Sequence, residues 1–169
     1  MIQEAFEYSE KYGTPVFLRP TTRVCHGYAS IMVKDETEYT HHQPEGFIKD
    51  SKRWVIFPRL SFMNHKKIEA RNQELSDIFS SYEKNTIHPS CDAFKDSKKG
   101  IATGGISYTY TMETLKKTGM VKTLKIATPH PFPEKLAVDF LSGLDEVLCL
   151  EELDPVIERE LIYICGKYH

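Results

Sequence analysis

The chain has 169 residues, of which 40% are hydrophobic and 27% are charged, a composition typical of a globular protein and not of a disordered one. Its 22 basic and 24 acidic residues leave a formal net charge of −2, which gives no electrostatic basis for binding nucleic acid or an anionic membrane. The length suits one domain, or one domain with an additional piece, and allows a substantial core without metal or disulfide support.

Four cysteines are spaced too widely to form a recognisable metal motif, and no C-x-x-C pair occurs. Cys149 and Cys165 lie in apolar runs, which favours buried, reduced thiols over a zinc or iron–sulfur site. No apolar run reaches the length of a membrane span. Together these features predict a cytoplasmic protein.

The first part of the chain is predicted to be a helix over residues 2–12, ended by Gly13, and then a short strand over residues 16–18. A chain that begins inside a helix, with no leading loop, is expected to be a piece of a longer polypeptide. Residues 27–50 mix charge with Pro and Gly and are predicted to be irregular.

The middle of the chain contains one long polar helix, predicted at about residues 64–83 from apolar side chains that recur on one stripe. Residues 84–99 are predicted to be a loop because they are rich in Asp and Lys and contain Pro89.

From Lys99 onward, strand and helix patterns alternate three times with short links. The predicted strands are "GIATGG", "VKTLKIATP" and "DEVLCLEEL", and the predicted helices are "SYTYTMETLKKTG", "PEKLAVDFLSGL" and "DPVIERELIYICGKYH". This order predicts an α/β domain with a parallel sheet and right-handed crossovers.

Ligands of such sheets bind beyond the carboxyl ends of the strands. Gly104 and Gly105 lie where the first strand turns into a helix, so their backbone N–H groups could hold a phosphate. The third glycine of a dinucleotide fingerprint is missing, and close packing of the helix on the strand is the other interpretation.

Three carboxylates follow the last strand: Glu151, Glu152 and Asp154. They could serve as an acid/base pair or hold a cation. Alternatively, Asp154 caps the final helix and the glutamates complement its positive end. The adjacent His41 and His42 could bind a metal, but neighbours on an extended chain point to opposite sides, which favours a solvated loop.

The stretch "LRPTTRVCH" contains a second polar cluster: Arg19, Thr21, Thr22, Arg23 and His26. Arginine can bind carboxylate or phosphate in bidentate fashion, and threonine hydroxyls can add hydrogen bonds. Ligand contact and structural bracing at a domain boundary both remain open.

Several stretches, in order, resemble one family, the large (alpha) subunit of indolepyruvate ferredoxin oxidoreductase, a thiamine-diphosphate-dependent 2-oxoacid:ferredoxin oxidoreductase. They are "EAFEYSEKYGTPVFLRPTTRVCH", "FIKDSKRWVIFP", "GIATGGISYTY", "PFPEKL" and "LEELDPVIERE". They span nearly the whole chain, and "LRPTTRV" with "EELDP" is quite specific.

This resemblance implies a domain plan and an activity. Residues 1–26 would be the end of the pyrimidine-binding domain, residues 27–98 a connector with the long polar helix, and residues 99–169 a three-layer α/β domain like the transketolase C-terminal domain. Members decarboxylate an aryl 2-oxoacid oxidatively, form a CoA thioester and reduce ferredoxin. They use thiamine diphosphate, magnesium and iron–sulfur clusters, and pair an alpha with a beta subunit.

The chain departs from the family pattern in lacking a G-D-G…N diphosphate and magnesium signature and the cysteine-rich cluster motifs. We therefore expect a fragment that folds, binds none of these cofactors alone and does not turn over, so that no catalytic or metal-binding residue is assigned. Arg19, Thr22, Arg23, Gly104 and Gly105 are the candidates for contact with cofactor or substrate. The alternatives are a stand-alone α/β module that binds a small anionic ligand or nucleotide at its strand ends, and a scaffold domain.

Overall fold

The computed structural model describes residues 2–39 and 43–168 of the chain. The predicted loop histidines, His41 and His42, lie outside these residues. Among the helices described, none combines the length and the apolar character that crossing a membrane requires.

A four-stranded sheet forms the centre of the α/β part of the chain. It consists of β1 (Thr86–His88), β2 (Lys99–Gly104), β3 (Lys122–Ile126) and β4 (Glu146–Leu150), in the order β1-β3-β2-β4. β2 runs parallel to both of its neighbours, while β1 is antiparallel to β3. The predicted α/β fold with a parallel sheet is thus confirmed, with one antiparallel edge strand added.

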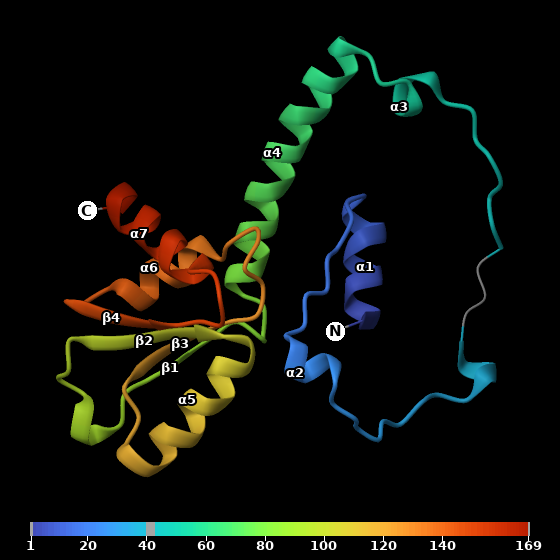
Figure 1. Ribbon diagram of the computed structural model, residues 1–169. Coiled ribbons are helices and arrows are strands. Elements are labelled where there is room, and N and C mark those ends of the chain that lie inside the picture. Colours follow the sequence, from blue (N-terminus) through green and yellow to red (C-terminus); the bar gives the residue numbers. More distant parts are fainter. Residues whose placement is uncertain (1, 40–42, 169) are drawn as a thin grey trace.

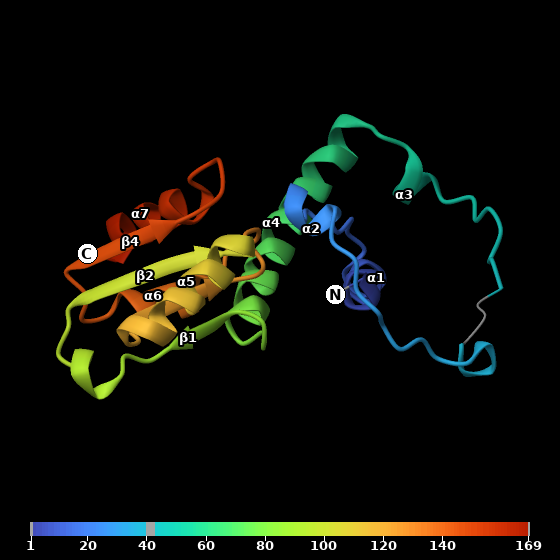
Figure 2. The ribbon, with the colours of Figure 1, turned by 60° about the horizontal axis from the view of Figure 1, so that its bottom comes forward.

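Helices cover both faces of this sheet, giving three layers (Figures 1 and 2). α5 (Gly105–Thr118) lies on one face, and α6 (Glu134–Leu141) and α7 (Val156–Tyr168) lie on the other. The core lies between the sheet and the α6–α7 layer, because alternate residues of each strand point to the same side. It contains Ala102, Leu124, Ile126, Phe132, Ala137, Phe140, Ile157, Leu161 and Ile164.

β1 corrects the predicted loop at residues 84–99. The three residues Thr-Ile-His are too short for a recognisable strand pattern, and they form a strand because β3 offers a free edge and Ile87 packs against the core. The sheet therefore includes residues that precede Lys99.

The long polar helix is present as α4 (Pro58–Ser80), about six residues earlier at its start than predicted. Pro58 at the first helical position explains the start, because its missing N–H has no partner to lose there. α1 (Ile2–Tyr12) is present as predicted and packs on the end of α4, with the Tyr8 and Phe79 rings 5.7 Å apart.

The predicted strand at residues 16–18 is wrong. These residues are exposed and join no strand of the described sheet, and a strand without a neighbouring backbone is not stable. Between the short α2 (Thr22–Cys25) and α4, the described residues 26–39 and 43–57 are irregular as predicted, apart from a 3₁₀ turn at Glu36–Glu38 and α3 (Ser51–Trp54). In Figure 1 this stretch extends far from the sheet before it returns at α4.

Candidate functional site

The carboxyl ends of the three parallel strands meet at one edge of the sheet, where β2 ends at Gly104, β3 at Ile126 and β4 at Leu150. The loops after β2 and β4 lead to helices on opposite faces, which is the arrangement that opens a crevice in doubly wound sheets. The hydroxyl of Thr103, which is fully buried, donates to the Leu150 carbonyl (2.9 Å) and ties the two strand ends together.

The two glycines after β2 serve different purposes. A Cβ at Gly104 would lie 2.6 Å from the Ile126 carbonyl oxygen, so no side chain fits between the neighbouring strands at this point. Gly105 has a φ of 54°, in the left-handed region that favours glycine. Gly104 is also the N-cap of α5 and contributes no side-chain hydrogen bond there.

The segment with the predicted arginine–threonine cluster passes the start of α5. The methyl carbon of Thr21 lies 3.6 Å from the position that a Cβ at Gly105 would occupy. The Thr21 hydroxyl oxygen is buried and has no hydrogen-bond partner within the described chain.

The other members of this cluster are placed differently. Arg19 and Thr22 are exposed, and Thr22 begins α2. The side chain of Arg23 lies outside the described residues, and His26 is the exposed C-cap of α2. The structure thus places Thr21 of this segment beside the glycine turn.

The carboxylates after β4 are split by the structure. Glu151 caps α7, since its two carboxylate oxygens accept hydrogen bonds from the backbone N–H groups of Ile157 (2.7 Å) and Glu158 (3.0 Å). Glu152 and Asp154 are exposed. The prediction that Asp154 caps this helix is wrong, because only its backbone carbonyl is used, accepting from Val156 (2.9 Å).

The loop after β3, residues 127–133, is held by a buried asparagine that the sequence analysis missed. Asn85 donates to the Phe79 carbonyl (2.8 Å) and to the Thr128 hydroxyl (2.6 Å). Its side-chain oxygen accepts from the backbone N–H groups of Ala127 (2.7 Å) and Thr128 (3.2 Å). This one side chain therefore joins the end of α4 to the end of β3.

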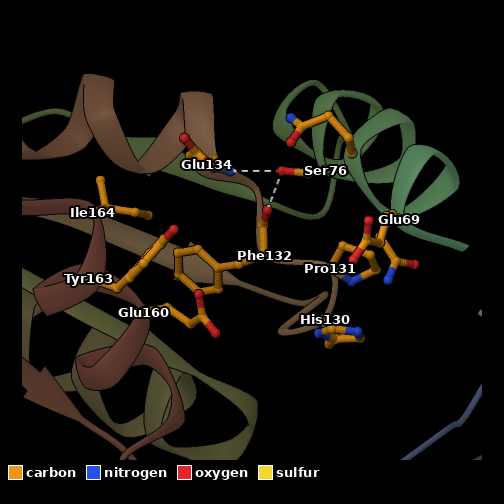
Figure 3. A pocket seen from close by; sticks show the side chains of 11 residues that line it. Glu69, Ser76, His130, Pro131, Phe132, Glu134, Glu160, Tyr163 and Ile164 are labelled. Atoms are coloured by element: carbon orange, nitrogen blue, oxygen red, sulfur yellow. Dashed lines mark hydrogen bonds between the residues drawn. The ribbon is translucent and has the colours of Figure 1, made fainter. Parts of the chain in front are cut away.

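Ser76 of α4 holds the far end of the same loop (Figure 3). Its hydroxyl donates to the Phe132 carbonyl (2.5 Å) and accepts from the Glu134 N–H (3.3 Å). Neither Ser76 nor Asn85 belongs to a motif or a periodic pattern, so no signal in the sequence would have singled them out.

An open pocket of about 410 Å³ lies beside this loop, between α4 and α7 (Figure 3). Three glutamates line it, Glu69, Glu134 and Glu160, together with one histidine, His130, and with amide, hydroxyl and apolar side chains; no lysine or arginine is among the lining residues. The pKa of Glu134 is lowered mainly by a hydrogen bond from Lys167 and also by one from Tyr168. A pocket of this charge does not fit the diphosphate of thiamine diphosphate or the phosphates of CoA.

Metal-ligating groups are dispersed. Within residues 2–39 and 43–168 no three His, Cys, Asp or Glu side chains come together in a way that could hold a metal ion. Cys25 is exposed, while burial raises the pKa of the Cys149 thiol to about 11, which disfavours the thiolate that a cluster needs. The donor set described here therefore does not fit an iron–sulfur cluster.

Comparison with known proteins identifies clear relatives. The chain is 35% identical over 168 residues to indolepyruvate oxidoreductase subunit IorA of Methanothermobacter thermautotrophicus, covering 98% of this chain and 26% of that protein. It is 35% identical over 166 residues to the subunit of the same name from Pyrococcus abyssi, and 30% identical over 156 residues to that from Archaeoglobus fulgidus.

The resemblance found in the sequence is confirmed by these matches. The chain spans about a quarter of the length of the curated relatives it matches. No family model and no solved structure matches the chain.

Proposed function

We propose that this chain functions as part of an indolepyruvate:ferredoxin oxidoreductase alpha subunit. Nearly the whole chain is similar to about a quarter of subunit IorA. The single observation that supports the proposal is the continuity of the match, which covers 98% of this chain in one relative. A module that shared only a common α/β fold would not match in the irregular residues before α4 as well.

The proposed parent enzyme removes CO₂ from an aryl 2-oxoacid such as indolepyruvate, forms the acyl-CoA and passes two electrons to ferredoxin. Thiamine diphosphate, with magnesium, would supply the carbanion chemistry, and iron–sulfur clusters would carry the electrons. The acidic pocket and the dispersed cysteines of this chain favour placing these groups in other parts of the alpha subunit and in the beta subunit.

We assign a structural role to the chain itself. Residues 99–169 would be the transketolase C-terminal-like domain, an assignment supported by the mostly parallel sheet, which also takes in β1, while α4 packs against α6. Residues 1–26 would end the pyrimidine-binding domain, with residues 27–98 as connector. The position of Thr21 beside Gly105 supports an interface between the first and last of these parts.

Arg19, Thr22, Arg23, Gly104 and Gly105 remain the proposed contacts with cofactor or substrate, since the glycine turn lies at the carboxyl end of β2. The variants Arg19→Ala and Arg23→Ala in the complete enzyme distinguish the two roles. A raised KM for indolepyruvate with unchanged thermal stability indicates contact, whereas reduced stability with unchanged KM indicates bracing.

The experiment that tests the proposal measures indolepyruvate-dependent reduction of methyl viologen in the presence of CoA. The polypeptide of IorA length that includes this sequence, together with its beta subunit, should reduce the dye, and the 169-residue chain alone should not. Turnover by the chain alone would show that the structural assignment is mistaken. Failure of the complete enzyme with every aryl 2-oxoacid would remove the proposed activity.

A further inference from the structure

The irregular stretch before α4 exposes an unusual amount of apolar surface. We call its described residues, 27–39 and 43–57, the arm. Tyr28 is fully exposed, and Met32, Phe47 and Ile56 are 98%, 85% and 88% exposed. Further large apolar side chains of the arm are more than half exposed: Ile31, Val33, Tyr39, Ile48, Trp54, Val55 and Phe57.

The area involved is that of a protein interface. An aromatic side chain buries about 150–250 Å², so covering Tyr28, Phe47, Trp54 and Phe57 at their present exposures would remove roughly 500–750 Å² from water. The aliphatic side chains of the arm add to this. A standard interface buries about 800 Å² on each partner, whereas the largest apolar patch of a monomer is about 300–600 Å².

The chain is attached to α4 on both sides of the arm, so the arm is not a fraying terminus. Before the arm, Arg71 of α4 donates from Nη1 to the Tyr12 and Gly13 carbonyls (3.4 and 3.1 Å), which fixes the end of α1. At its other end the chain enters α4 at Pro58. Fixed ends reduce the conformational entropy that the arm loses when it docks.

The surface that covers the arm is not in the described part of this chain, because the arm extends away from the sheet and its three helices (Figure 1). The charges along residues 27–57 nearly cancel. Four residues are basic and five are acidic: Lys34, Lys49, Lys52 and Arg53, against Asp35, Glu36, Glu38, Glu45 and Asp50. This balance suits an apolar protein surface and neither nucleic acid nor an anionic membrane.

We infer that the arm docks onto an apolar surface of the part of the alpha subunit that lies outside this chain, an inference that rests on the proposed function. The curated relatives are about four times as long as the chain, and their similarity to it extends through the arm. The remaining three quarters of such a subunit need a surface on this quarter to pack against, and the arm carries eleven of the exposed large apolar side chains of the described residues.

Hydrogen–deuterium exchange compares the 169-residue chain with the polypeptide of IorA length that contains it. In the chain alone, backbone amides of residues 28–39 and 43–57 should exchange at the rates of an unstructured peptide. In the longer polypeptide, without its beta subunit, these amides should exchange at least 100-fold more slowly. Amides of β2 and β3 should be protected in both samples and thereby show that the sheet is folded.

Paired variants in the longer polypeptide separate docking from general stability. Phe47→Ser and Ile56→Ser should each accelerate exchange throughout the arm by 10-fold or more while β2 stays protected. Ile162→Ser is the matched control, since Ile162 is an exposed apolar residue on α7, and it should leave arm exchange unchanged.

Four outcomes would overturn the inference. Arm amides that exchange equally fast in both polypeptides would show that the rest of the subunit does not cover them. Protection that appears only with the beta subunit, or only in a concentration-dependent dimer of the 169-residue chain, would assign another occupant. If the arm of the longer polypeptide is exposed but the polypeptide still oxidises indolepyruvate with its beta subunit, the inference fails and the proposed function stands. A reading frame that ends at His169 would remove both the inference and the proposed function.

Discussion

Replacing Asn85 with alanine is the most direct test of how the loop after β3 is held. The side chain is 5% exposed and makes four hydrogen bonds, to Phe79, Ala127 and both the backbone and the hydroxyl of Thr128. The variant Asn85→Ala removes all four and leaves buried backbone groups without a partner. At about 0.5–1.5 kcal/mol for each bond, with a further penalty for unpaired buried groups, we expect a loss of about 3 kcal/mol.

The assay is urea denaturation of the chain at pH 7, followed by circular dichroism. In a thermal melt, the same loss of about 3 kcal/mol corresponds to a fall in Tm of roughly 6–12 °C for a domain of this size. Asn64→Ala is the matched control, because Asn64 lies on α4 away from this network, and it should change stability by less than about 0.5 kcal/mol. If Asn85→Ala loses less than about 1 kcal/mol, the reasoning is refuted.

Three further predictions concern groups at the edges of the α/β part. In urea denaturation, Glu151→Ala should lower the free energy of unfolding by about 1–2 kcal/mol, because Glu151 caps α7. Asp154→Ala should lower it by less than about 0.5 kcal/mol, because its side chain does not cap the helix. Equal losses in the two variants would contradict the assignment. A hydrogen bond from Lys84 lowers the pKa of Glu4 to about 2, so the stability contributed by this pair should be present above about pH 4.5 and decline toward pH 2. The decline should be smaller in the variant Glu4→Gln. If the variant and the original chain lose stability identically in acid, the result would argue against the pair. With its pKa raised to about 11, Cys149 should have about 100-fold less thiolate at pH 8 than a thiol with the unperturbed pKa of 9.0, and because a more basic thiolate is more nucleophilic it should react with Ellman's reagent about 10-fold more slowly. Prompt labelling in a variant that keeps only this half-buried cysteine would exclude the raised pKa.

The sequence predicted the regular half of the chain well because local and tertiary preferences agree there. From Lys99 onward every predicted strand and helix is present, and the apolar faces of α6 and α7 meet the strands as their periodicity requires. α1 and the long helix α4 were also predicted, since apolar spacing marks a helix whatever it packs against.

The two errors about strands share one cause, which is that the deciding partner is distant in the sequence; the error about the helix cap is local. Residues 16–18 have the composition of a strand but find no strand neighbour among the described residues, whereas residues 86–88 have almost no pattern and become a strand because β3 accepts them. Asp154 stands where a cap is usual, yet Glu151 reaches the helix because Leu153, with a φ of 72°, turns the backbone between them.

The same limit explains what could be learned of the site. The glycine turn was recognised from spacing alone, but its contact with Thr21 joins residues more than eighty positions apart, and no local pattern encodes it. Asn85 likewise couples the end of α4 to residues 127 and 128, more than forty positions further along the chain. Asn85 holds the carboxyl edge of the sheet by hydrogen bonds from outside the strand–helix repeats, and Thr21 lies against the same edge. The segments before Lys99 therefore determine the shape of that edge as much as the repeats do, and substitutions at Thr21 or Asn85 should alter it while leaving the sheet intact.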